Sequence, residues 1–254
     1  MNTDFIRCEH VTRDFRTAGG VDFQALAAVD LTIRQNEFLC LLGPSGCGKT
    51  TLLNLIAGFM RPSSGDIRIA GGPVSSPGPD RGVVFQDYSL FGWLTVRGNV
   101  EFGPRMARMP AEERRALADH YLSLVGLTKF ADKYPFELSG GMKQRVAIAR
   151  SLVTKPRVLL MDEPFAALDA MTRNSLQSEV LAIQRAEEKT VIFVTHNIGE
   201  AIFLADRIVV MSSHPGRIQE VINVDFPRPR TRTAASFNEL YERLESAIGL
   251  HAVE

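Results

Sequence analysis

At roughly 150 residues per domain, the 254 residues of the chain predict one large domain or two closely joined ones. Hydrophobic residues make up 45% and charged residues 23% of the sequence, and the 29 basic residues equal the 29 acidic ones. This composition excludes a disordered or fibrous chain, and the zero formal charge gives no support for a nucleic acid as a partner.

The three cysteines, Cys8, Cys40 and Cys47, are scattered and odd in number. They fit neither a disulfide framework nor a zinc site. The opening sequence MNTDFIRCEH has no apolar segment typical of a secretory signal, and no apolar run approaches the roughly 18 residues of a membrane-spanning helix. The sequence therefore predicts a soluble, cytoplasmic protein.

The first part of the chain is predicted to be rich in strands. Leu31 and Ile33 alternate with polar neighbours, and residues 38–42 are uniformly apolar. A uniformly apolar run of this length is typical of a strand buried on both faces of a parallel sheet. A Gly-rich turn follows, and further elements are expected as a helix over about 50–57 and short strands at 67–69 and 83–85.

The middle of the chain, from about 95 to 152, is predicted to be helical. Pro110 is placed as a first-turn proline, and Leu117, Tyr121 and Leu124 share one face of the segment that follows. Strands and helices then alternate again. The expected elements are strands at 158–161, 191–195 and 208–211 and helices over 170–187 and about 236–248.

A Gly-rich segment, residues 43–50, matches the pattern G-x-x-x-x-G-K-[ST] between a buried strand and a helix. Glycines let backbone N–H groups wrap around a polyanion, and the helix start adds free donors and a favourable dipole. Lys49 is expected to reach the β- and γ-phosphates, and the Thr50 hydroxyl is expected to bind Mg²⁺. The predicted nucleotide-binding residues here are Gly43, Pro44, Ser45, Gly46, Cys47, Gly48, Lys49, Thr50 and Thr51. A helix start also lowers a thiol pKa, so alkylation of Cys47 is predicted to inhibit, with protection by ATP.

Two acidic residues, Asp162 and Glu163, end the strand at 158–161. A carboxylate at the carboxyl end of a strand beside such a loop suits Mg²⁺ ligation through water, a role that falls to Asp162. Glu163 is placed to polarise a water that attacks the γ-phosphate. His196 ends the next buried strand and is predicted to be functional. The alternatives are a solvated turn for the two acids and a structural role for the histidine.

The segment Leu138-Ser139-Gly140-Gly141-Met142-Lys143-Gln144-Arg145 resembles the signature motif of ATP-binding cassette (ABC) ATPases. Ser139 is an N-cap type of residue, and the glycines leave the amides of the helix start accessible. The resemblance implies that this helix start completes the ATP site of a partner subunit. The partner is a second copy or a related ATPase, in a head-to-tail dimer that binds two ATP molecules. An ordinary loop before a helix is the alternative.

Further positions resemble ABC motifs one at a time. Gln86 resembles the glutamine that contacts Mg²⁺ and the attacking water, Asp169 resembles the D-loop aspartate at the dimer interface, and His196 resembles the switch histidine that senses the γ-phosphate. Phe15 is the candidate for stacking on adenine, with Phe23 as the neighbouring alternative. The resemblance thus implies three groups of site residues: catalytic Glu163, His196 and Gln86; metal-binding Thr50, Gln86 and, through water, Asp162; and, acting on the partner's nucleotide, Ser139, Gly140, Gly141, Gln144 and Asp169.

This resemblance covers residues 5–225 and implies an α/β fold. It consists of a P-loop NTPase core with a mostly parallel sheet flanked by helices, an N-terminal antiparallel β portion and an inserted α-helical subdomain. The expected organisation is a single ABC ATPase domain over 1–254. The α/β core takes 1–94 and 153–225, the helical subdomain with the signature takes 95–152, and a tail and helix take 226–254. In the tail, Arg228, Arg230 and Arg232 are expected to be solvated, with an anionic contact as the alternative.

Residues 82–96 and His214-Pro-Gly-Arg-Ile218 resemble the ATPase subunits of bacterial nitrate, sulfonate and taurine importers. The resemblance implies an importer ATPase bound through a separate permease to the cytoplasmic face of the inner membrane, with a solute-binding protein acting indirectly. Tyr88, Phe91 and Trp93 are the predicted permease contacts, and core packing is the alternative for these aromatic residues. The alternative functions are an exporter or lipid-transport ATPase, a soluble ABC protein of DNA repair or translation, and a nonhydrolytic nucleotide switch.

Overall fold

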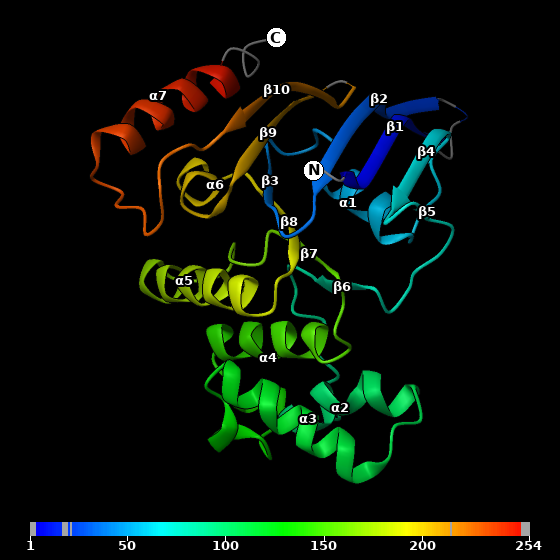
Figure 1. Ribbon diagram of the computed structural model, residues 1–254, viewed down its shortest axis with the longest axis vertical. Coiled ribbons are helices and arrows are strands. Elements are labelled where there is room, and N and C mark those ends of the chain that lie inside the picture. Colours follow the sequence, from blue (N-terminus) through cyan, green and yellow to red (C-terminus); the bar gives the residue numbers. More distant parts are fainter. Residues whose placement is uncertain (1–3, 17–19, 21, 214, 250–254) are drawn as a thin grey trace. The chain divides into compact units, whose positions relative to one another are not determined.

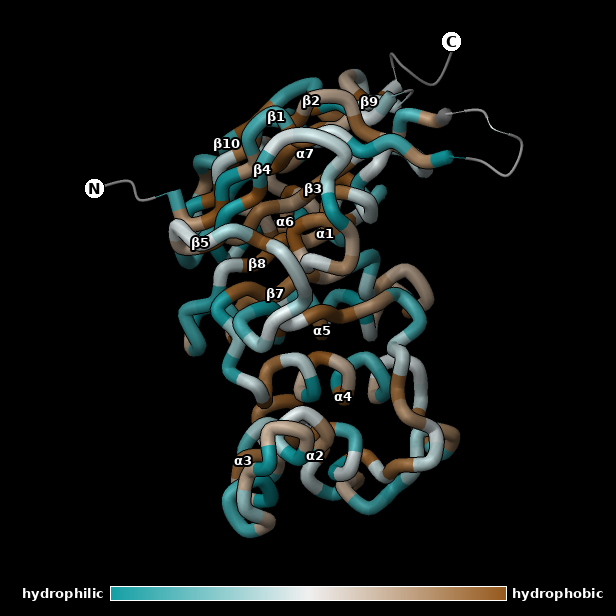
Figure 2. The backbone as a smooth tube through the Cα atoms, turned by 90° about the vertical axis from the view of Figure 1, so that its right-hand side faces the viewer, coloured by the Kyte–Doolittle hydropathy of each residue, from teal (hydrophilic) through white to brown (hydrophobic). Residues whose placement is uncertain are grey.

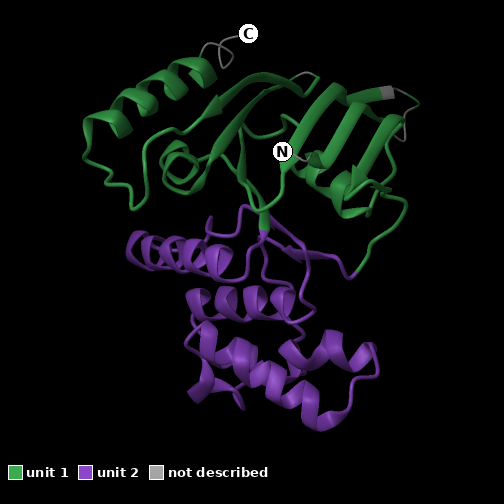
Figure 3. Cartoon of the chain, viewed as in Figure 1, with its two compact units in different colours: residues 1–78, 190–254 green, residues 79–189 purple. Residues whose placement is uncertain are grey.

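The computed structural model describes residues 4–16, 20, 22–213 and 215–249 (Figure 1). The chain divides into two compact units, which Figure 3 colours separately. Unit 1 comprises residues 1–78 and 190–254, and unit 2 comprises residues 79–189.

Among the described residues, unit 1 contains strands of two sheets and three helices. The antiparallel sheet has the order β2-β1-β4-β5. In the other, β3 pairs in parallel with both β8 and β9, and β10 pairs antiparallel with β9. The strands are β1 Asp4–Arg16, β2 Asp22–Arg34, β3 Phe38–Leu42, β4 Ser64–Ile69, β5 Gly72–Pro73, β8 Thr190–Thr195, β9 Arg207–Ser212 and β10 Arg217–Asn223, and the helices are α1 Lys49–Ala57, α6 Ile198–Leu204 and α7 Ala235–Gly249.

The parallel strands form the core of unit 1. Every residue of β3 and of β8 is buried, as the uniformly apolar runs predicted, because helices cover both faces of a parallel sheet. The hydrophobic stretches are brown in Figure 2. The carboxyl ends of β3 and β8 lie side by side, since Leu42 pairs with Thr195, so the segments that follow these strands emerge at one edge.

Unit 2 is mainly helical. Strands β6 Arg81–Val84 and β7 Val158–Asp162 pair in parallel, and α4 packs against α2, α3, α5 and β6. The helices are α2 Val96–Met106, α3 Ala111–Leu124, α4 Gly140–Leu152 and α5 Ala170–Ala186, with short 3₁₀ turns η1 Thr128–Phe130 and η2 Pro135–Glu137. The predicted α/β fold and its run of helices are confirmed; the helical subdomain over 95–152 stays a prediction.

The prediction for α3 was wrong in detail. The buried face carries Ala118, Tyr121 and Leu122, whereas Leu124 is 37% exposed. Residues 118 and 122 are one helical turn apart and share a stripe with 121, so the face that packs inward is displaced from Leu124. Pro110 is the N-cap of this helix rather than a residue of its first turn.

Candidate active site

The Gly-rich loop joins β3 to α1 in unit 1, as predicted. Gly46 and Gly48 have φ angles of 80° and 88°, in the left-handed region that glycine adopts without strain. Gly48 is also the N-cap of α1 and supplies no side chain to cap its amides. The helix start therefore offers N–H groups to an anion.

Residues of β2 and β9 and of the turn after β9 pack closely against this loop. A Cβ on Gly43 would lie 2.4 Å from the carbonyl oxygen of Met211, at the end of β9. A Cβ on Gly48 would lie 2.5 Å from Cδ2 of Leu26 in β2, and one on Gly216 would lie 2.3 Å from the carbonyl oxygen of Cys47. At Gly43 and Gly216 the added Cβ would meet backbone atoms, so a side chain at either position would displace the loop.

Gly216 ties the turn between β9 and β10 to β2. Its N–H donates to the carbonyl of Ala25 at 3.1 Å, and its carbonyl accepts from the N–H of Ala27 at 3.0 Å. Sequence reasoning placed Gly216 in the importer-like segment 214–218 but did not predict this role under the P-loop. His214, which belongs to the same importer-like segment, lies outside the described residues.

Lys49 is buried, and its ammonium group lies within the loop. Nζ donates to the carbonyl oxygens of Gly43 at 2.7 Å and Pro44 at 2.8 Å and lies 3.7 Å from Sγ of Cys47. A bound phosphate would compete with these carbonyls for the ammonium protons. The side chain is thus already directed into the loop that the motif predicts will hold the phosphates.

The expectation that the helix start lowers the pKa of Cys47 was wrong, whereas the inhibition by alkylation stays a prediction. Burial raises the pKa of Cys47, and this effect outweighs the nearby Lys49 ammonium, which lowers it. The side chain is fully buried. Sequence reasoning recognised the helix start, which favours a thiolate, but the sequence does not show that other segments bury the sulfur.

His196 follows β8 directly, with an exposed side chain. The next residue, Asn197, caps α6, since its Oδ1 accepts from the N–H of Glu200 at 3.0 Å. The buried Thr195 hydroxyl lies 2.6 Å from Oε2 of Glu200. The backbone on both sides of His196 is therefore held by a strand and a capped helix.

The two candidates for adenine stacking face each other in neighbouring strands. Phe15 in β1 pairs with Phe23 in β2. The guanidinium of Arg13 lies 4.6 Å from the centre of the Phe15 ring, and Phe23 is 47% exposed. Both rings belong to unit 1, and the role of Phe15 in binding adenine stays a prediction.

In unit 2, the predicted carboxylates lie at the end of β7. Asp162 is the last residue of that strand, and Gln86 follows shortly after the parallel strand β6. Because parallel strands end at the same edge of a sheet, these residues share one edge. Glu163 has a φ of 41°, a strained conformation for a non-glycine residue that is found preferentially at active sites.

The signature segment begins α4. Ser139 is its N-cap, and the Ser139 hydroxyl accepts from the N–H of Met142 at 3.4 Å. A Cβ on Gly141 would lie 2.5 Å from Cγ2 of Thr172 in α5, so this glycine lets the two helix starts approach. Asp169 is the N-cap of α5, where hydrogen bonds from Thr172, then from Met171, lower the pKa of its carboxyl.

Gln144, predicted to act on a partner's nucleotide, is fully buried in α4. Among the described residues its side-chain amide nitrogen and oxygen have no hydrogen-bond partner. Such a buried amide carries a desolvation cost. A contact with a partner's nucleotide would require this side chain to move, and the contact stays a prediction.

The aromatic segment after Gln86 lines a groove of about 420 Å³ whose walls include Phe85, Phe91 and Phe102. Trp93 is 75% exposed, so the alternative of core packing is wrong for this residue. Arg150 of α4 also lines the groove, and burial lowers its pKa. Its guanidinium donates to the carbonyls of Ser89 at 2.5 Å and Tyr88 at 2.9 Å.

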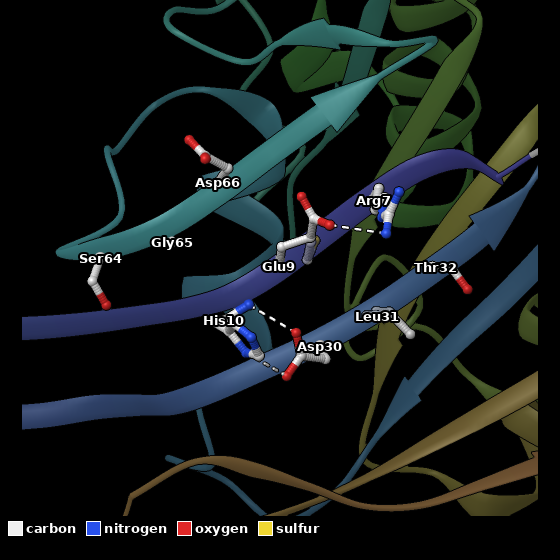
Figure 4. Close-up of a pocket in the computed structure, with 10 residues that line it drawn as sticks. Arg7, Glu9, His10, Asp30, Leu31, Thr32, Ser64, Gly65 and Asp66 are labelled. Carbon is white, nitrogen blue, oxygen red and sulfur yellow. Dashed lines mark hydrogen bonds and ion pairs between the residues drawn. The ribbon is translucent and has the colours of Figure 1, made fainter.

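A larger cavity lies on the face of β1, β2 and β4 (Figure 4). Its volume is about 890 Å³, and Glu9, His10, Asp30 and Asp66 are among the lining residues. Nδ1 of His10 lies 2.9 Å from Oδ2 of Asp30. No residue of the predicted nucleotide site lines this cavity, so size alone does not locate the site.

Within the described ranges, no helix combines the length and apolar character needed to cross a bilayer. The same ranges contain no group of three or more His, Cys, Asp or Glu side chains placed to hold a metal ion.

A strand, a Gly-rich loop and a helix, together with carboxylates at the end of another strand, define a P-loop nucleoside triphosphatase. The model of the ABC transporter family matches residues 26–166. The chain belongs to this family and is an ATP-binding ATPase.

Relatives cover nearly the whole chain. It is 50% identical to an uncharacterized ABC transporter ATP-binding protein of Methanocaldococcus jannaschii, over 94% of this chain and 89% of that protein. It is 47% identical to a nitrate import ATP-binding protein of Synechococcus elongatus, over 97% of this chain and 90% of that protein. A bicarbonate transport ATP-binding protein of the same species is 48% identical over 96% of this chain and 37% of that protein. A solved dimeric ATP-binding cassette with ADP and phosphate has a TM-score of 0.77 and 33% identity, over 87% of this chain and 100% of that one.

Proposed function

We propose that the chain is the ATPase subunit of an importer that moves a small anion of the nitrate or bicarbonate kind through a separate permease. The observation that carries this proposal is the 47% identity to a nitrate import ATP-binding protein over nearly the full length of both chains. The proposed place is the cytoplasmic face of the cell membrane, where the permease holds the ATPase and a solute-binding protein delivers the anion from the other side.

In the proposed site, two copies face each other head to tail. The loop over 43–51 of one copy binds the phosphates, and the Ser139 helix start of the other copy contacts the γ-phosphate. Dimeric solved neighbours support this arrangement. Each copy then holds half of each site, with Phe15 on the adenine and Asp169 at the interface between copies.

Mg²⁺ fits the chemistry of the three predicted metal-binding residues. Thr50 offers a hydroxyl, Gln86 an amide oxygen and Asp162 a carboxylate that acts through water; Mg²⁺ prefers such oxygen ligands and keeps several waters. When bound with ATP, Mg²⁺ would supply positive charge that offsets the negative charge of the phosphates.

The residues of the chain then carry out hydrolysis as follows. Lys49 exchanges the carbonyls of Gly43 and Pro44 for phosphate oxygens. Glu163 orients a water and accepts its proton as the water oxygen bonds to the γ-phosphorus and the bond to the ADP oxygen breaks. His196 contacts the γ-phosphate from the end of β8. ATP and water thus give ADP and phosphate.

ATP drives transport in this proposal because it binds the closed dimer more tightly than the open one. Its γ-phosphate bridges the loop of one copy and the Ser139 helix of the other. Hydrolysis removes that bridge, so the dimer reopens and returns the permease to its first state.

The test is the substitution Glu163→Gln, which keeps the size of the side chain but removes its basicity. We expect turnover to fall by about 100-fold or more and a dimer with trapped ATP to accumulate, as measured by size exclusion with light scattering. The control Glu163→Gln with Lys49→Ala should stay monomeric, because the phosphates lose their ammonium partner. A Glu163→Gln variant that stays monomeric with saturating ATP contradicts the proposal.

We propose that the groove around Phe91 is the binding site for a short helix of the permease. Phe91→Asp should abolish coupled transport in the reconstituted importer and leave the ATPase rate of the isolated chain within about twofold, because Phe91 lines the groove and is not among the predicted nucleotide-binding or catalytic residues. The control is Phe136→Asp, which alters an exposed aromatic residue elsewhere in unit 2. Equal loss of transport in both variants would argue against the groove.

A further inference from the structure

A buried arginine in the tail holds the end of α6. Arg230, between β10 and α7, is only 7% exposed. Its Nη1 donates to the carbonyl oxygens of Ile202 at 2.6 Å and Ala205 at 2.5 Å. Its Nη2 donates to Val224 at 3.2 Å, and its Nε donates to Phe226 at 3.2 Å. The expectation of a solvated segment is therefore wrong for this residue.

These contacts satisfy groups that the helix itself leaves without partners. The last carbonyls of an α-helix have no N–H partner within it, and a cation is favoured there by the helix dipole. Arg228 contributes at the same end, since it donates to the carbonyl of Leu204 and pairs with Asp206 at 2.7 Å. Its side chain is 11% exposed, so the expectation of a solvated segment is wrong for this residue too. Because α6 has only seven residues, it depends on such external contacts rather than on its own cooperativity.

The N-terminal end of α6 lies next to His196 in the chain. Asn197 caps the helix, and the contact between Thr195 and Glu200 ties its first turn to β8. A displacement of the helix would therefore move the backbone that carries His196. Figure 1 shows α6 and α7 beside the strands of unit 1.

We propose that Arg230 is a positioning residue for His196: it holds the C-terminal end of α6 and thereby fixes the backbone from which His196 reaches the γ-phosphate. This inference rests on the proposed role of His196. The hydrogen bonds that define the role of Arg230 go to α6 and to the segment after β10, and none of these bonds goes to the P-loop. Loss of Arg230 should therefore change the rate of hydrolysis rather than the binding of ATP.

The test is a double-mutant cycle on the purified full chain, with kcat and KM for ATP measured for each variant. Arg230→Met should lower kcat by about tenfold, since small misplacements of a reacting group are costly, and leave KM within about twofold. His196→Ala should lower kcat by about 100-fold, and adding Arg230→Met should lower it no further. Arg243→Ala is the matched control, because Arg243 is an exposed tail arginine that pairs with Glu220 and does not bind α6.

The results separate the two proposals. A wild-type kcat in Arg230→Met, or an equal loss in the His196→Ala background, overturns the positioning role and leaves the proposed function intact. A wild-type kcat in His196→Ala overturns the proposed role of His196 and the inference with it. If Arg230→Met does not fold, Arg230→Lys carries the comparison. It keeps the charge with fewer donors and should lower kcat by about threefold at unchanged KM; a wild-type kcat would overturn the proposal.

Discussion

The contact between Gly141 and Thr172 predicts how the start of the signature helix responds to a single methyl group. In Gly141→Ala the new Cβ would lie 2.5 Å from Cγ2 of Thr172, whereas carbon atoms in contact prefer about 3.5–4.0 Å. The helices must therefore separate by about 1 Å, or Thr172, whose χ1 is restricted in a helix, must leave its rotamer.

Such overpacking costs about 1–3 kcal/mol, and the better helix propensity of alanine offsets up to about 1 kcal/mol of it. We expect a net destabilisation of about 0.5–2 kcal/mol. This corresponds to a fall of about 2–6 °C in the melting temperature, measurable by differential scanning calorimetry.

The control Thr172→Ser removes the methyl group that the new Cβ would strike. In the double variant, the nearest remaining atom is Cβ of residue 172, at 3.9 Å. The double variant should therefore recover at least about 1 kcal/mol relative to the sum of the single changes. Strictly additive effects would refute the packing argument. If Gly141 also contacts a partner's phosphate, the double variant will be stable and still hydrolyse ATP slowly.

Four further outcomes follow from the contacts described above. Lys49→Met should weaken ATP binding by about 100-fold or more, because a charge-assisted contact to phosphate is lost; unchanged binding in calorimetry would exclude the ammonium from the phosphate site. Gly216→Ala should raise KM for ATP by about tenfold, since its Cβ would strike backbone atoms of Cys47 and Ala25, whereas Gly249→Ala, with open space around it, should not. Arg150→Met should speed the hydrogen exchange of the amides of residues 88–91 by about tenfold, because about one hydrogen bond from a charged group is lost. Equal exchange rates in the variant and the wild type would show that this guanidinium does not hold the segment. Burial raises the pKa of Cys47 above its ordinary value and so disfavours the reactive thiolate; maleimide labelling near neutral pH should therefore be much slower than that of a free thiol, and labelling at the free-thiol rate would contradict this.

The sequence predicts the elements of the site because its motifs depend on local order along the chain. The strand before Gly43 and the helix after Gly48 lie where the pattern places them, and the acids end β7 as expected. Packing by distant segments is what the sequence does not show. Arg230 is buried because α6 presents carbonyls to it, and Trp93 is exposed although it is the largest apolar side chain in its segment.

The role of Gly216 could not be predicted from the sequence for the same reason. Its sequence context predicts only a turn, and the need for glycine arises from the P-loop backbone, which is remote in the sequence. No periodicity or composition signal carries that information. A residue of this kind is found only when the two segments are seen in contact.

The hydrogen bonds between Gly216 and β2 have a practical consequence for protein engineering. Turns between antiparallel strands are usually the preferred places to insert a tag, a fluorophore or a whole domain. Here the turn between β9 and β10 is joined by hydrogen bonds to Ala25 and Ala27, directly behind the loop that would receive the triphosphate. An insertion at this turn would therefore be expected to impair nucleotide binding. The turn between β4 and β5, around Gly71, is the better place for a reporter, because a Cβ added there meets nothing within 4 Å.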